Sequence, residues 1–363
     1  MSRLIRAVID TGALRSNLKA LRRFAPRARV VAVVKANAYG HGLVPTALAL
    51  TEADAFGVAR IDEGIALRAA GIAQPIVLLE GIFTSDELAE AAQRSFDLVV
   101  HDARQIELLE KSQGGHPFVL WLKIDTGMNR LGFRSEDFAS ALLRLQRLPT
   151  PPREMRLLTH LARADEREDA ATLEQLARFD ALTRGVALGR SIGNSAAILG
   201  TPAAQGDWIR PGIALYGVSP FVGTSALGFG LVPVMTLETT VIATRRVARG
   251  EGVGYGATWR AERDTPIAIL AGGYGDCVPR SLANGAPVLV NGQRAPLVGH
   301  VSMDMLAVDI TAVADVEVGS RAVLWGAELP VEEVARHAGT WSGPGEEGAQ
   351  AQDVQLPSPL PRL

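Results

Sequence analysis

The sequence predicts an α/β fold: an N-terminal (β/α)8 barrel of the TIM type, followed by a mostly β C-terminal domain. Three observations support this. Short apolar runs alternate with helical patterns in the first part of the chain, strands with little helix between them follow, and the first apolar run, residues 29–34, ends at Lys35. Strands alternating with helices are typical of parallel sheets, and barrels place their chemistry at the carboxyl ends of the strands.

Eight apolar runs between residues 28 and 217 are candidate barrel strands, because each is short and lies between turns or helical patterns. They cover residues 30–34, 55–59, 75–80, 97–101, 118–124, 155–160, 190–194 and 212–217. Helical spacing follows in segments such as 61–71, 84–94 and 171–182, and Thr84 or Ser85 with Glu87 resembles an N-terminal cap. A doubly wound open sheet is the competing fold, but it usually has fewer strands, and no strong glycine-rich dinucleotide loop is present.

After about residue 230 the pattern changes to strands with little helix between them. The predicted strands cover residues 236–247, 266–272, 287–299, 305–310 and 321–326, and one short helix is predicted at 331–338. Asn291-Gly292 is a hairpin signal. We therefore expect a barrel domain at 1–230 and a β domain at 231–340. The tail, 341–363, is rich in Gly, Pro, Gln and Ser without periodicity, which predicts disorder.

Bulk properties exclude several classes of protein. The 363 residues are 47% apolar, which suits a globular protein, and a net charge of −2 argues against a general nucleic-acid partner. Cys277 is the single cysteine, so no internal disulfide or paired-cysteine zinc motif exists, and no metal site is expected. The N-terminus lacks an apolar signal region, and no apolar stretch reaches about 18 residues, so we expect a cytoplasmic protein without a membrane partner.

Lys35 is the strongest candidate for a chemically reactive residue. It closes a buried-strand pattern and opens the segment Ala36-Asn37-Ala38-Tyr39-Gly40. A lysine amine can condense with a carbonyl to form a Schiff base. A solvated lysine at a strand end is the alternative, and a lone lysine does not distinguish the two.

The segments around Lys35 and further along the chain carry a resemblance. They read VVKANAYGHG (33–42), KIDTGMNRLG (123–132), THLA (159–162), NSAA (194–197), RPGIALYG (210–217), VGYGATW (253–259), GYGD (273–276) and SMD (302–304). Together they resemble the alanine racemases, enzymes that bind pyridoxal phosphate (PLP), over about residues 4 to 340. The resemblance implies interconversion of L- and D-alanine through a PLP aldimine, supplying D-alanine for peptidoglycan.

The resemblance implies a two-base mechanism, with one base on each face of the substrate Cα. Lys35 would bind PLP and also act as the base for the D-isomer, and Tyr255 would be the base for the L-isomer. In the family this tyrosine comes from the second subunit, which implies a homodimer with shared active sites. The alternative for Tyr255 is a turn tyrosine packed between Gly254 and Gly256.

A further set of residues would hold the cofactor by the same resemblance: Tyr39, His160, Asn194, Ser195, Arg210, Gly212 and Ile213. The hydroxyls of Tyr39 and Ser195, with the backbone amides of Gly212 and Ile213, would bind the phosphate near the last strands, where barrels commonly bind phosphate. Arg210 would bond the pyridine nitrogen and keep it unprotonated, because a guanidinium is only a donor. His160 is expected behind Arg210. An arginine capping a barrel end and an ordinary core histidine are the alternatives for these two.

The substrate contacts implied by the resemblance come from both predicted domains. Arg130 would bind the carboxylate of alanine by its side chain and Met303 by its backbone amide, and a guanidinium suits a carboxylate. Tyr274 and Asp304 would line the entrance to the site and favour alanine over bulky side chains.

Lys123 is the position that carries a carbamate in many family members, where the carbamate would orient Arg130. The alternative is a lysine that pairs with Asp125. The sequence also departs from the family after Thr340, where the usual Tyr-Glu helix and final basic strand are missing, and at Cys277. Two other functions stay open: a broad-specificity amino-acid racemase on the same fold, or a PLP-binding relative that is catalytically impaired because of the atypical tail.

Overall fold

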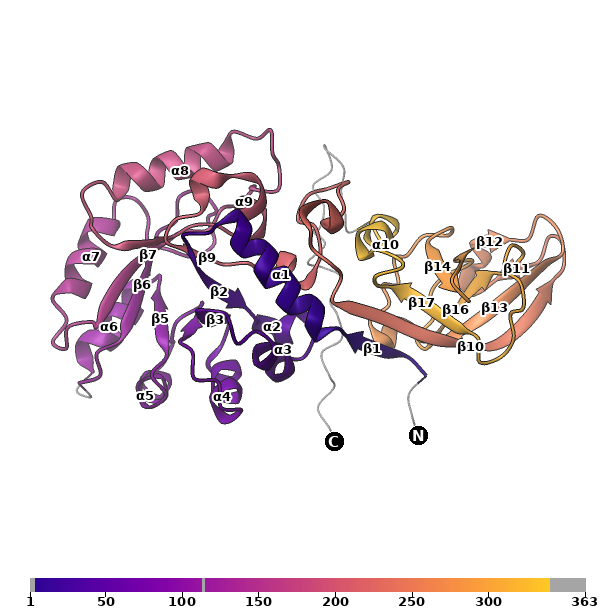
Figure 1. Ribbon diagram of the computed structural model, residues 1–363, viewed down its shortest axis with the longest axis horizontal. Helices are drawn as coiled ribbons and strands as arrows, with labels where there is room; N and C mark the ends of the chain where they lie inside the picture. The colour runs from indigo at the N-terminus through magenta and orange to yellow at the C-terminus, as the bar shows by residue number, and fades with distance from the viewer. Residues whose placement is uncertain (1–3, 113–114, 340–363) are drawn as a thin grey trace. The chain divides into compact units, whose positions relative to one another are not determined.

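The structure is a computed structural model that describes residues 4–112 and 115–339. The chain divides into two compact units, one formed by residues 14–215 and the other by the N-terminal residues up to 13 together with the chain from residue 216 onward. Figure 1 labels their elements. The predicted disordered tail, 341–363, lies outside the described residues.

The first unit contains an eight-stranded parallel sheet in the order β8-β7-β6-β5-β4-β3-β2-β9. Its strands are β2 (Arg29–Val33), β3 (Ala55–Val58), β4 (Ile76–Leu78), β5 (Asp97–Val100), β6 (Val119–Lys123), β7 (Glu154–Leu158), β8 (Gly189–Ser191) and β9 (Trp208–Ile209). The first and last strands of this order, β8 and β9, are joined by hydrogen bonds of 2.8 Å from Asp207 N to Arg190 O and from Arg210 N to Gly193 O, so the sheet closes into a barrel. The predicted TIM-type barrel is confirmed.

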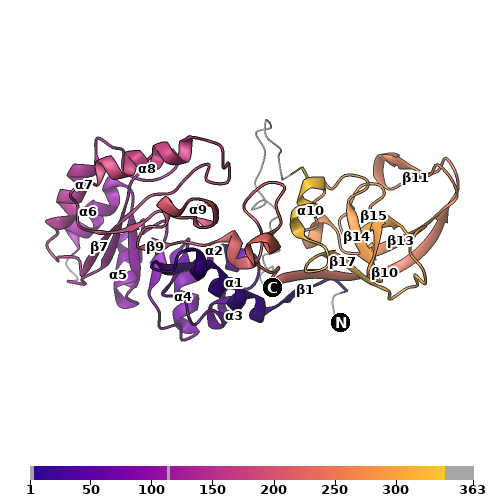
Figure 2. The same ribbon diagram turned by 45° about the horizontal axis from the view of Figure 1, so that its top comes forward.

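Helices follow most of these strands, and Figures 1 and 2 show several of them on the outside of the sheet. They are α1 (Thr11–Phe24), α2 (Lys35–Tyr39), α3 (Leu43–Ala49), α4 (Ile61–Ala69), α5 (Ser85–Gln93), α6 (Ala103–Lys111), α7 (Phe138–Gln146), α8 (Ala171–Leu182) and α9 (Ser195–Gly200), with the short 3₁₀ turn η1 (Pro202–Ala204). Thr84 caps α5 as predicted, because its side chain accepts a 3.2 Å hydrogen bond from Glu87 N. No described helix is long and apolar enough to cross a membrane.

The eighth strand lies earlier in the chain than predicted. Residues 212–217 were expected to form it, but β9 is the eighth strand, and a 3₁₀ turn, η2 (Ile213–Tyr216), follows. Pro211 has no N–H to donate to a strand neighbour. The N–H groups of Gly212 and Ala214 are taken by the Ser195 hydroxyl, so they cannot join a ladder.

Side chains alternate between the inside and the outside of the barrel along each strand. The inner core includes Val31 and Trp121, and the Arg156 guanidinium lies against the rings of both Trp121 and Trp208, 4.6 Å and 4.3 Å from their centroids. Because the side-chain period is two residues, Lys123 shares the inner face with Trp121 but lies one step closer to the carboxyl end of β6. The apolar core therefore fills the lower barrel and leaves the upper layer to polar side chains.

The second unit is built on a seven-stranded sheet in which β15-β14-β17-β10-β13-β16 lie in order and β1 pairs with β10. Its strands are β1 (Arg6–Ile9), β10 (Met235–Val247), β13 (Thr265–Ala271), β14 (Pro287–Val290), β15 (Gln293–Pro296), β16 (Met305–Asp309) and β17 (Arg321–Trp325), with the small pair β11 (Gly252–Val253) and β12 (Trp259–Arg260). The hairpin signal is confirmed: Asn291 and Gly292 have φ of 48° and 76° between β14 and β15. The antiparallel pairing of β1 with β10 was not predicted.

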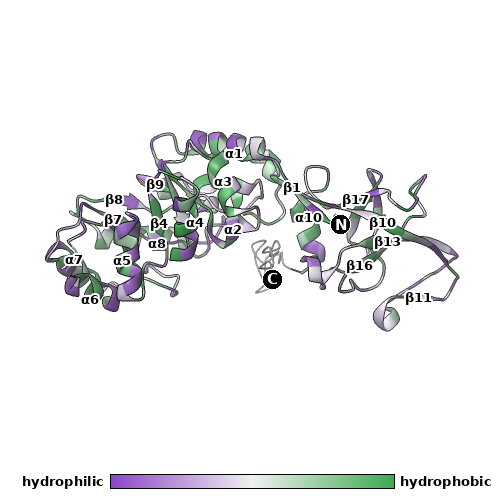
Figure 3. Ribbon diagram, turned by 90° about the horizontal axis from the view of Figure 1, so that it is seen from below, coloured by the Kyte–Doolittle hydropathy of each residue, from purple (hydrophilic) through white to green (hydrophobic). Residues whose placement is uncertain are grey.

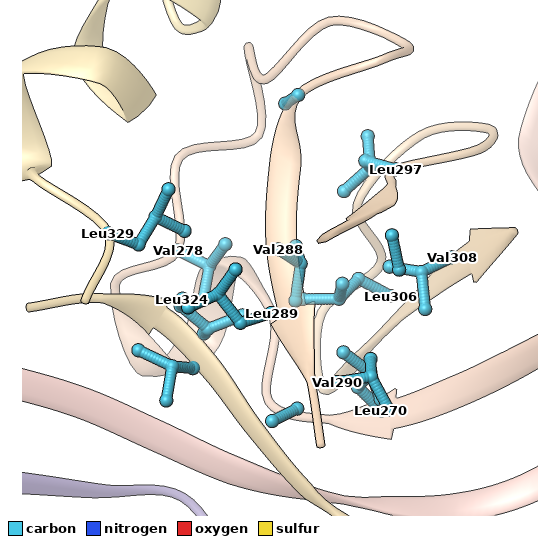
Figure 4. Close-up of a cluster of buried hydrophobic side chains, with 14 of the residues drawn as sticks. Leu270, Val278, Val288, Leu289, Val290, Leu297, Leu306, Val308, Leu324 and Leu329 are labelled. Atoms are coloured by element: carbon cyan, nitrogen blue, oxygen red, sulfur yellow. The ribbon is translucent and has the colours of Figure 1, made fainter. Parts of the chain in front are cut away.

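A continuous apolar core holds this unit together. Figure 4 shows its leucine and valine side chains, among them Leu270, Leu289 and Leu306, which come from different strands of the sheet. The helix α10 (Val331–His337) adds Val334, and η3 (Ala226–Phe229), η4 (Tyr255–Ala257) and η5 (Tyr274–Asp276) are short turns. Figure 3 shows how α1, in the other part of the chain, alternates between hydrophilic and hydrophobic residues, as expected for a helix with one buried face.

Candidate active site

Lys35 begins a short stretch of unusual backbone at the carboxyl end of β2. The four residues after it, Ala36 to Tyr39, have φ between 53° and 55°, so α2 turns in the left-handed sense. Each such residue with a Cβ costs about 1–2 kcal/mol relative to the right-handed form. Strained backbone of this kind persists where the surroundings hold it, and it clusters at functional sites. The turn therefore marks Lys35 as a functional candidate independently of its chemistry.

Two side chains hold the left-handed turn. Asn37 Oδ1 accepts a 2.9 Å hydrogen bond from Leu43 N. His41 Nδ1 lies 3.0 Å from the carbonyl oxygens of Ala38 and Tyr39, which can only accept, so this nitrogen carries the proton. Burial lowers the pKa of His41 to about 4, so the ring is neutral near pH 7.

Cationic side chains gather at the carboxyl edge of the barrel strands. Lys35 follows β2, Lys123 ends β6, Arg130 follows β6 and Arg210 follows β9. Burial, and then Arg130, lowers the pKa of Lys35. Burial lowers the pKa of Lys123 to about 8, with further lowering by Arg210 and Arg130. A lysine amine of lowered pKa loses its proton more easily and can then act as a nucleophile or base, and the surrounding positive charge suits an anionic ligand.

Arg210 is buried with its guanidinium held on several sides. Nη1 donates to Ser191 Oγ over 2.6 Å, and Nη2 donates to Thr159 O over 2.6 Å and to His160 Nδ1 over 3.3 Å. A guanidinium cannot accept, so His160 Nδ1 is unprotonated. Burial, followed by the charge of Arg210, lowers the pKa of His160 well below its usual value, which agrees with a neutral ring. Burial also lowers the pKa of Arg210, to about 10, so it remains a cation at neutral pH.

Ser195, Tyr39 and Gly212 meet near the ends of the last strands. Ser195 Oγ accepts hydrogen bonds from Gly212 N over 3.0 Å and from Ala214 N over 3.2 Å. Both lone pairs are then in use, so the Ser195 hydroxyl can only donate. A Cβ atom on Gly212 would lie 2.4 Å from the Tyr39 hydroxyl oxygen. Burial raises the pKa of Tyr39 to about 12, which keeps that hydroxyl a donor.

Asn194 and Ile213 flank this group. The Asn194 side chain caps α9 by accepting a 3.1 Å hydrogen bond from Ala197 N, and it donates to Leu161 O over 3.3 Å. Asn194 therefore fixes the start of α9, where Ser195 lies. Ile213 is buried and lies between the two amides bonded to Ser195.

Arg130 lies on a tight turn after β6. Asp125 Oδ1 accepts hydrogen bonds of 3.0 Å from Gly127 N and from Asn129 N, which shapes the turn. Gly132 has a φ of 127°, and a Cβ there would lie 2.7 Å from Asp125 N, so only glycine fits. Asp125 also lies 3.6 Å from Arg134, so it is engaged by groups other than Lys123.

The remaining predicted site residues lie in the second unit. Tyr255 is 72% exposed, on η4. Met303 and Asp304 lie beside the Tyr274 turn, because Gly275 N donates to Met303 O over 2.8 Å and Gly272 N donates to Asp304 O over 2.7 Å. The structure therefore assembles one group of predicted residues in the barrel and another in the β unit.

Two residues of the barrel site were missed by the sequence analysis. Asn37 holds the left-handed turn, and the tolerance of asparagine for positive φ was an available signal. Gln175 on α8 connects the loops after β6 and β7, and nothing in the sequence distinguished it from a surface glutamine.

The fold and the site together define a barrel enzyme with a group of cationic side chains, Lys35 among them, at the carboxyl ends of its strands. Residues 9–220 match the family model described as "Alanine racemase, N-terminal domain", and residues 234–343 match "Alanine racemase, C-terminal domain". The chain belongs to the alanine racemase family.

Individual relatives agree with this assignment. An alanine racemase from Shewanella amazonensis is 49% identical over 341 residues, covering 92% of this chain and 94% of the relative. The crystal structure of the biosynthetic alanine racemase from Pseudomonas aeruginosa has a TM-score of 0.93 and 43% identity, covering 98% of both chains. The alanine racemase from Bartonella henselae with covalently bound pyridoxal phosphate has a TM-score of 0.85 and 29% identity, covering 98% of this chain and 97% of that one.

Proposed function

We propose that this protein interconverts L- and D-alanine, using pyridoxal phosphate bound at Lys35. The observation that carries the proposal is the position of Lys35: a half-buried amine of lowered pKa, at the carboxyl edge of the barrel, opening a strained turn beside other cations. Membership of the alanine racemase family supports the reaction, and the Bartonella henselae relative supports the cofactor.

The residues of the barrel edge fit the cofactor. Tyr39 and Ser195 offer hydroxyls that can donate to a phosphate, and the missing side chain at Gly212 gives the Tyr39 hydroxyl the space that a Cβ would need. The Gly212 amide, which the resemblance assigned to the phosphate, is already bonded to Ser195 Oγ. We propose that the two hydroxyls and the backbone of Ile213 hold the phosphate, with Gly212 positioning Ser195 and Tyr39 and with Asn194 capping α9. In the described residues no hydrogen bond uses Arg210 Nε, so this donor can serve the pyridine nitrogen.

When bound, pyridoxal phosphate supplies an electron sink that stabilises negative charge at the substrate Cα. Arg210 would donate to the ring nitrogen and, as a cation at neutral pH, would keep that nitrogen unprotonated. His160 accepts from Arg210 and cannot supply a competing proton while it remains neutral. These two residues would restrain the reaction to proton exchange at Cα.

Inversion at Cα needs a proton acceptor on one face and a donor on the other. We propose that the Lys35 amine serves the D-isomer and that the Tyr255 hydroxyl serves the L-isomer. Tyr255 belongs to the β domain, 231–340, and is exposed, which suits a residue that completes the site of a second copy of the chain. On this proposal the protein acts as a homodimer, with the barrel domain, 1–230, binding the cofactor.

The substrate carboxylate would be bound by the Arg130 side chain and the backbone amide of Met303. Tyr274 and Asp304, which lie beside Met303, would line the entrance. A narrow, polar entrance would favour alanine. No observation favours the broad-specificity alternative, and turnover of lysine, arginine and serine measured against alanine is the assay that decides.

Lys123 fits a carbamate. It is 8% exposed, and burial lowers its pKa to about 8, so a useful fraction of the amine is neutral near neutral pH. The neutral amine would add to carbon dioxide, forming an N–C bond and releasing one proton, and the resulting anion would face Arg130 and Arg210. A carbamate carbon signal after exchange into ¹³C-labelled bicarbonate, absent in Lys123→Ala, tests this assignment.

The function is tested by borohydride reduction of the purified protein after incubation with pyridoxal phosphate. The reduced cofactor should be found on the peptide that contains Lys35, and Lys35→Ala should lose both this label and racemisation of alanine. Racemisation at a near wild-type rate in Lys35→Ala, without added amine, would refute the proposal. The cytoplasmic location and the supply of D-alanine for peptidoglycan stay predictions.

A further inference from the structure

Gln175 joins two loops of the active-site edge through one side chain. It lies on α8 and is 3% exposed. Its Oε1 accepts from Ala162 N over 2.9 Å, and its Nε2 donates to Thr126 Oγ1 and to His160 O, each over 3.1 Å. Thr126 follows β6, whereas His160 and Ala162 follow β7. The amide of Gln175 therefore fixes the two loops relative to each other.

The direction of each hydrogen bond in this network follows from its acceptors. Thr159 Oγ1 donates to Ile124 O over 2.9 Å, which uses its only hydrogen. Thr126 Oγ1, 2.8 Å from Thr159 Oγ1, must then donate to it. The Thr126 hydroxyl consequently receives its remaining bond from Gln175. Only a side chain with an acceptor for Ala162 N and two donors completes the network, and glutamine provides that set.

One of the loops carries Arg130. Thr126 begins the turn whose shape Asp125 fixes through Asn129 N over 3.0 Å, and Arg130 is the next residue. Arg178, one helical turn beyond Gln175 on α8, donates to the Thr126 carbonyl oxygen. Gln175 and Arg178 thus both hold Thr126, the start of the turn that carries Arg130.

The other loop holds the Arg210 guanidinium. Arg210 Nη2 donates to Thr159 O over 2.6 Å and to His160 Nδ1 over 3.3 Å. Gln175 Nε2 donates to the backbone carbonyl of the same residue, His160. A shift of residues 159–160 would therefore move the acceptors that orient Arg210.

We propose that Gln175 is a positioning residue for racemisation, which sets the placement of Arg130 and of Arg210 together by locking the two loops that hold them. The inference rests on the proposed function, in which Arg130 binds the substrate carboxylate and Arg210 bonds the cofactor ring. A glutamate at this position keeps the shape and the acceptor for Ala162 N but removes both donors. It also sets a carboxylate oxygen against the His160 carbonyl, so the link to that loop is lost.

The chain offers a matched control in Gln105 on α6. Gln105 is 4% exposed and makes a similar set of bonds: Oε1 accepts from His101 N over 2.8 Å, and Nε2 donates to Glu80 O over 3.0 Å and to Ile82 O over 3.2 Å. Its Nε2 also lies 3.2 Å from His101 Nε2, a contact that Gln175 lacks. Gln105 connects two strand ends, those of β4 and β5, but neither carries Arg130 or Arg210. Gln175→Glu and Gln105→Glu therefore make the same substitution at two buried positions that each join two loops.

The experiment compares both variants with the wild-type holoenzyme. Propionate is alanine without its amino group, and titration calorimetry with propionate measures binding of the carboxylate. The pH dependence of the bound-cofactor absorbance reports on the contact between Arg210 and the ring nitrogen of the cofactor. We expect both variants to unfold at lower urea concentration. Only Gln175→Glu should weaken propionate binding, by about tenfold or more, and shift the absorbance profile.

The inference would be overturned if Gln175→Glu bound propionate within twofold of the affinity of Gln105→Glu and had the same absorbance profile. Gln175 would then have a structural role only. If Gln175→Glu does not fold, Thr126→Val replaces it: this variant removes the Thr126 acceptor for Gln175 Nε2 and the bond from Thr126 to Thr159 Oγ1, and it leaves the bond from Gln175 to His160 O. It should weaken propionate binding, and unchanged propionate affinity would equally overturn the inference. Failure of the wild-type protein to take up pyridoxal phosphate or to racemise alanine would instead refute the proposed function.

Discussion

Tyr39 and Gly212 approach each other so closely that a Cβ atom on Gly212 would lie 2.4 Å from the Tyr39 hydroxyl oxygen. Tyr39 ends the left-handed turn after β2, and Gly212 follows β9, which pairs with β2. The neighbouring strands of a closed barrel thus bring together residues that are far apart in the sequence. The same closure places Ser195 against the Gly212 amide.

Gly212→Ala tests this contact. The new methyl group would displace the Tyr39 hydroxyl, which is the movable end of a side chain, so the fold should survive. Affinity for pyridoxal phosphate should fall by about tenfold or more, because at least one donor to the phosphate moves. Fluorescence titration of the apoprotein measures it. Gly228→Ala is the control, since a Cβ there meets no atom within 4 Å, and equal affinities in the two variants would show that Tyr39 is not a phosphate donor.

His41 should make the protein less stable in acid. Its folded pKa, about 4, lies below the unfolded value of 6.5, so the unfolded chain binds more protons as the pH falls. Stability from this group is present above pH 6.5 and is lost as the pH falls toward 4. At pH 5 the loss is about 2 kcal/mol.

Asp97 opposes this trend, because burial raises its pKa to about 6 and stability from that group grows on acidification. The difference in unfolding free energy between wild type and His41→Asn, followed with pH, therefore isolates the contribution of the histidine, since asparagine keeps a donor and does not titrate. Urea unfolding at pH 7 and pH 5 should show about 2 kcal/mol less acid destabilisation in the variant. An identical pH dependence in both proteins would mean that His41 is protonated in the fold.

Asn37 is expected to stabilise the left-handed turn. Asn37→Ala removes the hydrogen bond to Leu43 N and a side chain that tolerates positive φ, so unfolding should become easier by about 1–2 kcal/mol. Asn37→Gly restores the backbone freedom but not the hydrogen bond, and it should fall between alanine and wild type. Chemical denaturation measures both. A glycine variant less stable than the alanine variant would contradict the strain that we assign to this turn.

Tyr255 should matter for activity and not for folding. It is 72% exposed, so Tyr255→Phe should change the unfolding free energy by less than about 0.5 kcal/mol. Loss of a positioned acid or base should lower racemisation by about a hundredfold or more. Cofactor uptake at Lys35 should be retained.

Mixing Lys35→Ala chains with Tyr255→Ala chains tests whether sites are shared. Each mixed dimer would contain one site with both Lys35 and Tyr255, so part of the activity should return after subunit exchange. Either variant alone serves as the control. No recovery, with mixed dimers demonstrated by mass spectrometry, would mean that each site takes both residues from one chain.

The sequence by itself determined most of the architecture. Alternating apolar runs and helical spacing predicted the barrel, because hydrophobic periodicity is a local property of the chain. Local signals also identified the Thr84 cap and the Asn291-Gly292 hairpin, and the segments around Lys35 identified the family. The predicted strand at 212–217 was wrong because its amides are claimed by Ser195, which is distant in the sequence.

Only the tertiary structure decided how the site is held. The pairing of β1 with β10 joins the N-terminus to the second unit, and no local pattern encodes such a partner. The lowered pKa values of Lys35 and Lys123 arise from burial and from the charges of loop residues, Arg130 for both and also Arg210 for Lys123. Gln175 acquires its role because α8 sets its amide between two loops. Periodicity is written in neighbouring residues, whereas burial, charge and hydrogen-bond partners depend on which distant segments the closed barrel brings together.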